Sequence, residues 1–219
     1  MSSTKNRGIA AASAGSRPAR HRWLTWGIVA VVVAIVLVAL YGVFTASATS
    51  KVEGAGPSYD IGEPGPGQLA PDFTLTDNTG KQVSLKDYEG KNVLLYFQEG
   101  LTCQPCWDQL TSLEQDATKL KTAGVDAVLS ITTDPANQIA VKTQDMGLST
   151  PVLSDPDLSV STEYHANQFG MMGNSRDGHS FILVGPDGTI RWRADYGGAP
   201  NYTMYLPVDT LLNDLKTGV

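Results

Sequence analysis

The most restrictive feature of this sequence is an uncharged apolar segment near its amino end. From Trp26 to Phe44, no side chain except that of Tyr41 can ionise. A helix of this length, rising 1.5 Å per residue, would cross a bilayer hydrocarbon core of about 30 Å. Because such a segment is too long and too apolar for the core of a small domain, the sequence predicts an anchor and a separate folded domain.

The residues that flank this segment predict its orientation. The first fifty residues hold five Lys and Arg and no acid. By the positive-inside rule, the basic tail over residues 1–22 stays in the cytoplasm, and aromatic residues such as Trp23 mark the membrane interface. We therefore predict a single transmembrane helix over 23–45, with the rest of the chain outside. The alternative is a secretory signal, since the small-x-small pattern ending at Ala48 is typical of a cleavage site, and cleavage there would release a secreted protein.

Composition divides the exported part of the chain. Residues 46–68 are rich in Gly and Pro, which predicts a flexible linker. Residues 69–219 are numerous enough for one domain with a hydrophobic core. Outside the basic tail, the chain has 11 Lys and Arg against 22 Asp and Glu. This acidic balance disfavours nucleic-acid binding.

Hydrophobic patterning predicts an α/β domain in residues 69–219. Alternating stretches around a turn signal indicate an opening β-hairpin. Buried strands and amphipathic helices then alternate, which favours a mainly parallel sheet with helices on both faces. A Gly-Pro-Asp-Gly turn indicates a closing hairpin. The predicted strands are 73–76, 81–84, 92–97, 125–131, 151–153, 180–184 and 189–193, and the predicted helices are 106–123, 136–146 and 208–215.

The only two cysteines, Cys103 and Cys106, lie between a predicted strand and a predicted helix. Free N–H groups and the helix dipole at that position favour the thiolate, which is the reactive form. A purely structural disulfide would close a loop of about four residues and stabilise the fold by only about 2 kcal/mol. A structural zinc site needs four ligands, whereas the chain has two cysteines and three histidines, one of which lies in the basic tail. Reversible redox chemistry is therefore the favoured function of the pair.

Four segments of the predicted domain resemble the peroxiredoxin-related (AhpC/TSA-like) redoxins of the thioredoxin superfamily. They are APDFTL at 70–75, CQPC at 103–106, the stretch 151–164 and FILVGPDG at 181–188. The resemblance implies a thioredoxin-like fold with a central mixed sheet flanked by helices. It also implies that one cysteine attacks a disulfide or a peroxide and the other resolves the intermediate. Protein thiols or disulfides, or peroxide, would be the substrates, with an unidentified electron donor and no cofactor.

The sequence departs from two groups of that superfamily, the peroxiredoxins and the thioredoxin-type reductases. Peroxiredoxins surround their attacking cysteine with a proline, a threonine and an arginine. If Cys106 has that role, Glu99 and Cys103 occupy the first two positions, and Arg176 is the nearest substitute for the arginine. Because these peroxiredoxin residues are missing, peroxidase activity stays open. Thioredoxin-type reductases have a proline where this chain has His179. By analogy with thioredoxins, Cys103 is the nucleophile, and we adopt this assignment. By analogy with peroxiredoxins, the nucleophile is Cys106.

Other residues near the pair have supporting roles. Glu99 could accept or deliver a proton during thiol exchange, or could be a solvated loop acid. Trp107 is expected to pack beside the motif and tune access to it. Thr102 and Arg176 are counted as supporting residues because of their positions. His165 is more typical of a surface or packing residue than of a ligand.

Copper binding is the alternative function. The segment around His179 also resembles the histidine segment of Sco-type copper-delivering proteins, and two thiolates with an imidazole suit copper. The ligands would be Cys103, Cys106 and His179, although the Sco family has three residues between its cysteines. Met171 and Met172 could add soft ligands, but methionines more commonly fill gaps against a core.

Overall fold

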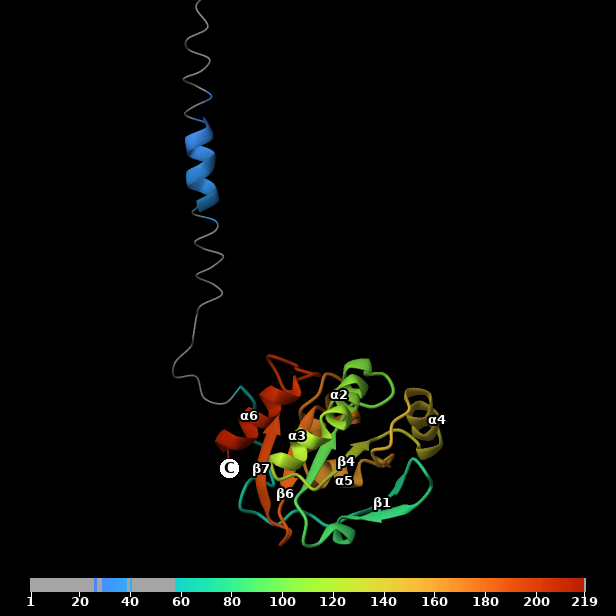
Figure 1. Cartoon of the computed structure of the whole chain (residues 1–219). Helices are drawn as coiled ribbons and strands as arrows, with labels where there is room; N and C mark the ends of the chain where they lie inside the picture. The colour runs from blue at the N-terminus through green and yellow to red at the C-terminus, as the bar shows by residue number, and fades with distance from the viewer. Residues whose placement is uncertain (1–25, 27–28, 39, 41–57, 219) are drawn as a thin grey trace, which may run out of the picture. The chain divides into compact units, whose positions relative to one another are not determined.

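The computed structural model describes Trp26, residues 29–38, Leu40 and residues 58–218 (Figure 1). The chain divides into two units, Met1–Ala55 and Gly56–Val219. In the first unit, residues 29–38 are helical and exposed. No helix within the described part of the chain is both long and apolar enough to cross a membrane. The predicted basic tail, much of the predicted anchor over 23–45 and the first part of the predicted linker lie outside the described residues.

A seven-stranded mixed sheet forms the centre of the second unit (Figure 1). Its order is β2-β1-β5-β4-β3-β6-β7. Strand β4 pairs in parallel with β3 and β5, whereas the other four pairings among the described strands are antiparallel. The strands are Thr74–Asp77 (β1), Gln82–Ser84 (β2), Val93–Phe97 (β3), Ala127–Thr132 (β4), Val152–Ser154 (β5), Ser180–Val184 (β6) and Ile190–Asp195 (β7).

The strand pairings test two expectations about this sheet. The mixed sheet implied by the family resemblance is confirmed, and so are both predicted hairpins. The mainly parallel sheet predicted from the alternation of strands and helices is wrong. The reason is that each hairpin joins the sheet with its own antiparallel pairing, and only the segment from β3 to β5 has the crossover helices that parallel pairing requires.

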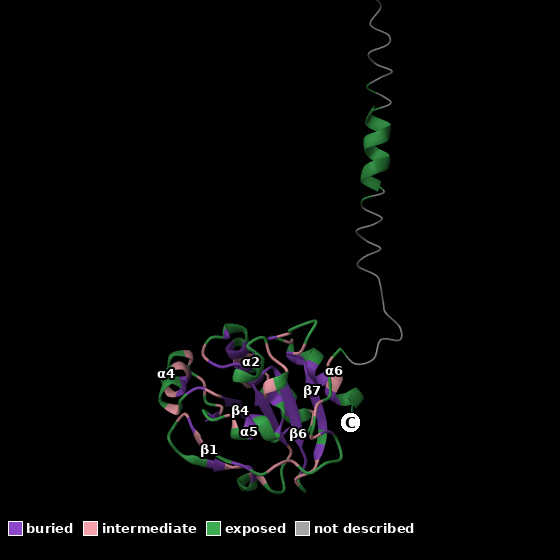
Figure 2. Ribbon diagram, turned by 180° about the vertical axis from the view of Figure 1, so that it is seen from behind, coloured by how far each residue is buried: buried purple, intermediate pink, exposed green. Residues whose placement is uncertain are grey.

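Helices and short 3-10 turns cover the two faces of the sheet. Figure 2 shows the strands buried and the helices exposed on their outer sides. The helices are Gln104–Gln115 (α2), Ala117–Thr122 (α3), Ala136–Met146 (α4), Ser159–Glu163 (α5) and Val208–Gly218 (α6), and the 3-10 turns are Leu85–Tyr88 (η1), Ala166–Gln168 (η2) and Gly173–Ser175 (η3). Helix α4 has the bounds that the sequence predicts, because Pro135 precedes it and Gly147 ends it in the left-handed conformation, with φ 65°.

The predicted helix over 106–123 is two helices in the structure. Helix α2 begins two residues earlier than predicted, because Cys103 caps it and Pro105 lies in its first turn, where a missing N–H has no cost. It ends at Asp116, where α3 begins. Aspartate competes with helical hydrogen bonds through its short polar side chain, which favours a break at this position.

The sheet separates two hydrophobic cores. Leu94 and Tyr96 of β3 face the core beneath α2, α3 and α6. Leu95 and Phe97 face the opposite core, which includes α5 and the hairpin β1–β2. Since successive side chains of a strand point to opposite faces, β3 is buried on both sides, as its continuous apolar run predicts. The central strand therefore provides a rigid base for the loop and helix that follow it.

Candidate active site

A disulfide joins Cys103 and Cys106 at the amino end of α2. Their Sγ atoms are 2.07 Å apart. Cys103 is the N-cap residue, and its Sγ accepts a hydrogen bond of 3.3 Å from the backbone N–H of Cys106. Cys106 lies in the first turn of the helix. The sequence predicts this placement, and unpaired N–H groups in a first helical turn stabilise negative charge on a nearby sulfur.

The two sulfurs differ in their access to solvent. Cys103 is 6% exposed, whereas Cys106 is completely buried. Beneath Cys106, the hydroxyl of Tyr96 donates a 3.1 Å hydrogen bond to the Cys106 carbonyl. Burial raises the pKa of Tyr96 well above its ordinary value, so this hydroxyl keeps its proton. The structure thus fixes Cys106 against the sheet and leaves Cys103 as the cysteine nearer to solvent.

The loop between β3 and α2 is held from two sides. The indole N–H of Trp107 donates to the Gly100 carbonyl at 3.0 Å, and the Leu101 N–H donates to Asp134 Oδ2 at 2.6 Å. Gly100 has φ +83°, and a Cβ there would lie 1.8 Å from Asp134 Oδ2. Trp107 is fully buried beside the cysteines, as its predicted packing role requires. Only glycine therefore allows this loop to reach its two anchors.

Glu99 belongs to this loop, and Arg176 contacts it. The Glu99 carboxylate is only 3% exposed and accepts a hydrogen bond from the Met171 N–H. The possibility that Glu99 is a solvated loop acid is therefore wrong, because the segment around Met171 covers it. Arg176 donates to the Glu99 carbonyl at 3.0 Å and pairs with Asp134 at 2.9 Å. Its guanidinium thus links the loop to Asp134.

A search for relatives identifies the family of this chain. Residues 66–193 match the family model described as the AhpC/TSA family. The chain belongs to this family. Peroxiredoxin Bcp of Escherichia coli is 34% identical over 153 residues, which are 68% of this chain and 94% of Bcp. Thiol-disulfide oxidoreductase ResA of Bacillus thuringiensis is 35% identical over 100 residues, or 45% of this chain, and the match spans about half of ResA, 56% of its length.

Solved structures agree with this assignment at the level of the fold. The crystal structure of peroxidoxin BcpB from Mycobacterium tuberculosis matches 69% of this chain and 96% of that chain, with a TM-score of 0.58 and 18% sequence identity. The thioredoxin-like fold implied by the sequence resemblance is confirmed. As a member of the AhpC/TSA family with peroxiredoxin and thiol-disulfide oxidoreductase relatives, the protein is an oxidoreductase.

His179 lies in an aromatic cluster on the α2 face of the sheet. Its ring contacts Tyr96, Phe181 and Tyr196, with centroid distances of 5.3, 5.1 and 6.2 Å. The side chain is fully buried, and neither ring nitrogen has a hydrogen-bond partner among the described residues. Burial lowers the pKa of His179 to about 3, although the nearby backbone of Thr203 favours the charged form slightly. His179 is therefore neutral at physiological pH.

The structure does not assemble the copper site that the alternative function requires. Within the described residues, no group of three or more His, Cys, Asp or Glu side chains is arranged to hold a metal ion. The predicted ligands Cys103 and Cys106 are bonded to each other. Met171 and Met172 are 58% and 51% exposed, so the expectation that they fill gaps against the core is wrong. The segment that carries them crosses the surface instead.

The remaining candidate residues lie at the surface. Thr102 is exposed next to Cys103, and His165 is exposed after α5. Sequence reasoning did not identify Tyr96, Asp134 or Met204, although each contacts the loop or the cysteines. Asp134 carries a detectable signal, because it follows β4 closely, and the carboxyl ends of parallel neighbouring strands lie at one edge of a sheet. Tyr96 and Met204 carry no such signal.

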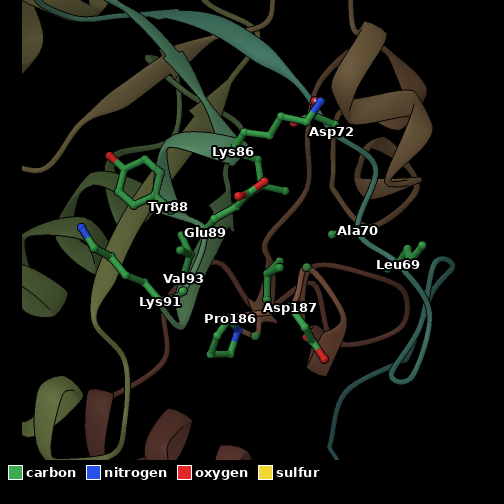
Figure 3. A pocket seen from close by; sticks show the side chains of 15 residues that line it. Leu69, Ala70, Asp72, Lys86, Tyr88, Glu89, Lys91, Val93, Pro186 and Asp187 are labelled. Atoms are coloured by element: carbon green, nitrogen blue, oxygen red, sulfur yellow. The ribbon is translucent and has the colours of Figure 1, made fainter.

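A cavity of about 480 Å³ lies at the opposite end of β3 from the disulfide (Figure 3). It is lined by residues around Val93, where β3 begins, and by the turn at 185–188 between β6 and β7. The side chains of Asp72 and Lys86 meet there in an ion pair of 2.5 Å, and both are substantially exposed. Because β3 leads away from this cavity toward the cysteines, the cavity is not part of the thiol site.

The burial of His179 predicts a specific pH dependence of stability. In the unfolded chain, a histidine has a pKa of about 6.5, whereas the folded value is about 3. Between these values the unfolded chain binds one more proton at this residue. The contribution of His179 to the free energy of unfolding is therefore complete above pH 6.5 and falls by about 1.4 kcal/mol per pH unit below it.

Chemical denaturation of a His179→Phe variant at several pH values tests this prediction. The variant should have a shallower decrease in stability between pH 6.5 and pH 4 than the wild type. His165→Asn is the matched control, since it removes an exposed histidine at a left-handed position that asparagine tolerates. Identical pH slopes for His179→Phe and the wild type would contradict the prediction.

Proposed function

We propose that this protein is a thiol-disulfide oxidoreductase that alternates between the Cys103–Cys106 disulfide and two thiols. The observation that carries this proposal is the disulfide at the amino end of α2, with Cys103 nearer to solvent and Cys106 fully buried. A short bridge within one helical turn restrains the unfolded chain weakly, so a purely structural role explains it poorly. The 35% identity to a protein named thiol-disulfide oxidoreductase gives independent support.

The geometry assigns different roles to the two cysteines. In the reductive direction, a partner thiolate attacks Cys103 Sγ, the Cys103–Cys106 bond breaks, and its electron pair passes to Cys106 Sγ, which then takes a proton. A second partner thiolate attacks the partner sulfur of this mixed disulfide and releases Cys103 as a thiolate. The Cys106 N–H, 3.3 Å from Cys103 Sγ, is positioned to stabilise that charge. The reverse sequence oxidises the pair and reduces a partner disulfide.

Substitution of each cysteine tests these roles. In an insulin-reduction assay, Cys103→Ser and Cys106→Ser should each lower turnover roughly 1,000-fold or more, because neither cycle can close. Cys106→Ser should accumulate a mixed disulfide at Cys103, detectable by mass spectrometry, whereas Cys103→Ser should not. Thr102→Ser, a conservative change at the exposed neighbour, is the control and should retain turnover. Mixed disulfides that form only at Cys106 would reverse the assignment.

Peroxide reduction is a second candidate function, favoured by relatives named as peroxiredoxins. In this reaction a cysteine thiolate would attack the peroxide, forming sulfenic acid and releasing water, and the second thiol would displace a further water to close the disulfide. Arg176, the nearest substitute for the peroxide-binding arginine, donates to Glu99 and pairs with Asp134. If Cys106 is the attacking cysteine, Glu99 stands where those enzymes have a proline. We therefore infer that peroxide is the poorer substrate.

Stopped-flow oxidation of the reduced protein by hydrogen peroxide tests this ranking. The rate constant should be no higher than that of an ordinary cysteine thiolate, since Arg176 donates to Glu99 and Asp134 of the loop scaffold. Arg176→Lys should leave this rate constant unchanged, because the arginine supports the loop. A much faster oxidation that slows in Arg176→Lys would show that peroxide is the natural substrate.

We also propose that residues 23–45 tether the domain to the outer side of a membrane. The basic residues before this apolar segment support that orientation. Secretion after cleavage near Ala48 is the alternative.

Membrane fractionation of the full chain in a bacterial host distinguishes the two locations. Under the tether proposal, the full-length protein stays in the membrane pellet after carbonate extraction, and external protease removes the domain. A soluble product whose mass corresponds to a chain beginning after Ala48 would establish cleavage instead. Deleting residues 1–45 is the control, and that product should remain inside the cell.

A further inference from the structure

Met204 lies directly against the disulfide. Its side chain, Cys103 and Cys106 form a small apolar cluster that is separate from the two main cores. Met204 is 7% exposed, and the two cysteines are 6% and 0% exposed. A thiol can exchange only with a sulfur that it can reach. Met204 thus belongs to the same small cluster as Cys103, the cysteine that is nearer to the surface.

The segment that carries Met204 is held by few interactions. Residues 202–207, between β7 and α6, contain no helix or strand. The Thr203 N–H donates to the Tyr196 carbonyl at 3.0 Å, and the Leu206 N–H donates to Gln109 Oε1 at 2.6 Å. The hydroxyls of Tyr205 and Ser112 are 3.2 Å apart. Segments with so few buried bonds open at a small fraction of the cost of global unfolding.

The outer surface next to this segment is hollowed. A depression of about 420 Å³ is lined by Pro105, Asp108, Thr111 and Ser112 of α2 and by Tyr205 of the covering segment. Pro105 lies between the two cysteines in sequence, and Tyr205 is the neighbour of Met204. A polypeptide seated in this depression would therefore contact both the redox motif and the segment that covers it.

We propose that Met204 is a gate that determines which thiols react with Cys103. This inference rests on the proposed thiol-disulfide exchange. The segment 202–206 must move before a reactant reaches Cys103 Sγ. A thiol in solution must therefore wait for this opening, and Met204 protects the disulfide from such thiols.

Reduction of the oxidised full chain by dithiothreitol, followed by stopped-flow fluorescence, tests the gate. The observed rate scales with the fraction of molecules whose gate is open. Met204→Ala should therefore be reduced about tenfold faster than the wild type. Its equilibrium with glutathione should be unchanged, because a gate changes the rates of reduction and reoxidation by the same factor. Met204→Leu, which keeps a side chain of similar volume, should keep the wild-type rate.

Met172→Ala is the matched control, since it truncates an exposed methionine that is not part of the cysteine cluster. It should be reduced at the wild-type rate. The gate proposal is overturned if Met204→Ala is reduced no faster than the wild type, or if its glutathione equilibrium shifts in proportion to the rate. Dithiothreitol reacts with any accessible disulfide. Absence of insulin turnover in the wild type would therefore overturn the proposed function and leave the gate measurement valid.

Discussion

The attachment of the first turn of α2 to the central strand is the constraint on which the site depends. Tyr96 reaches from β3 to the carbonyl of Cys106, and Trp107 reaches back to the carbonyl of Gly100. Both side chains are fully buried, so these bonds exchange little with water. Because β3 is packed on both faces, its position fixes the depth of each sulfur. The difference in exposure between Cys103 and Cys106 follows from this attachment, and it supports the proposed role of Cys103 as the nucleophile.

The acidic residues around the loop bear on the proposed ranking of substrates, in which peroxide is the poorer one. Glu99 and Asp134 are nearly buried, and Arg176 contacts both residues. Asp177 is completely buried, and its pKa is raised well above the ordinary value by burial and by the nearby acids. Arg176 uses one nitrogen, Nη1, for its contacts with both Glu99 and Asp134. The chain thus combines the family fold with a loop scaffold to which the arginine is bound.

The sequence predicts local features of this protein better than contacts between distant segments. Continuous apolar runs identify β3 and β6, and Pro and Gly signals identify the ends of α4 and the closing turn. The cysteine positions also follow from local order, because a strand, a loop and a helix succeed each other around Cys103. The burial of Glu99 depends on Met171, and the cover over the disulfide depends on Met204, about a hundred residues from the cysteines. No periodic pattern encodes such contacts, since they arise only when loops from several strands meet at one edge of the sheet.

The positive φ of Gly100 has a consequence for how relatives of this chain can diverge. Its missing side chain leaves room for Asp134 Oδ2, which in turn binds the N–H of Leu101. A lineage that acquires a larger residue at position 100 therefore has to lose or move the carboxylate at position 134, and Arg176 would then lose its counterion. These three positions are coupled by their contacts, so substitutions among them are expected to arise together in evolution.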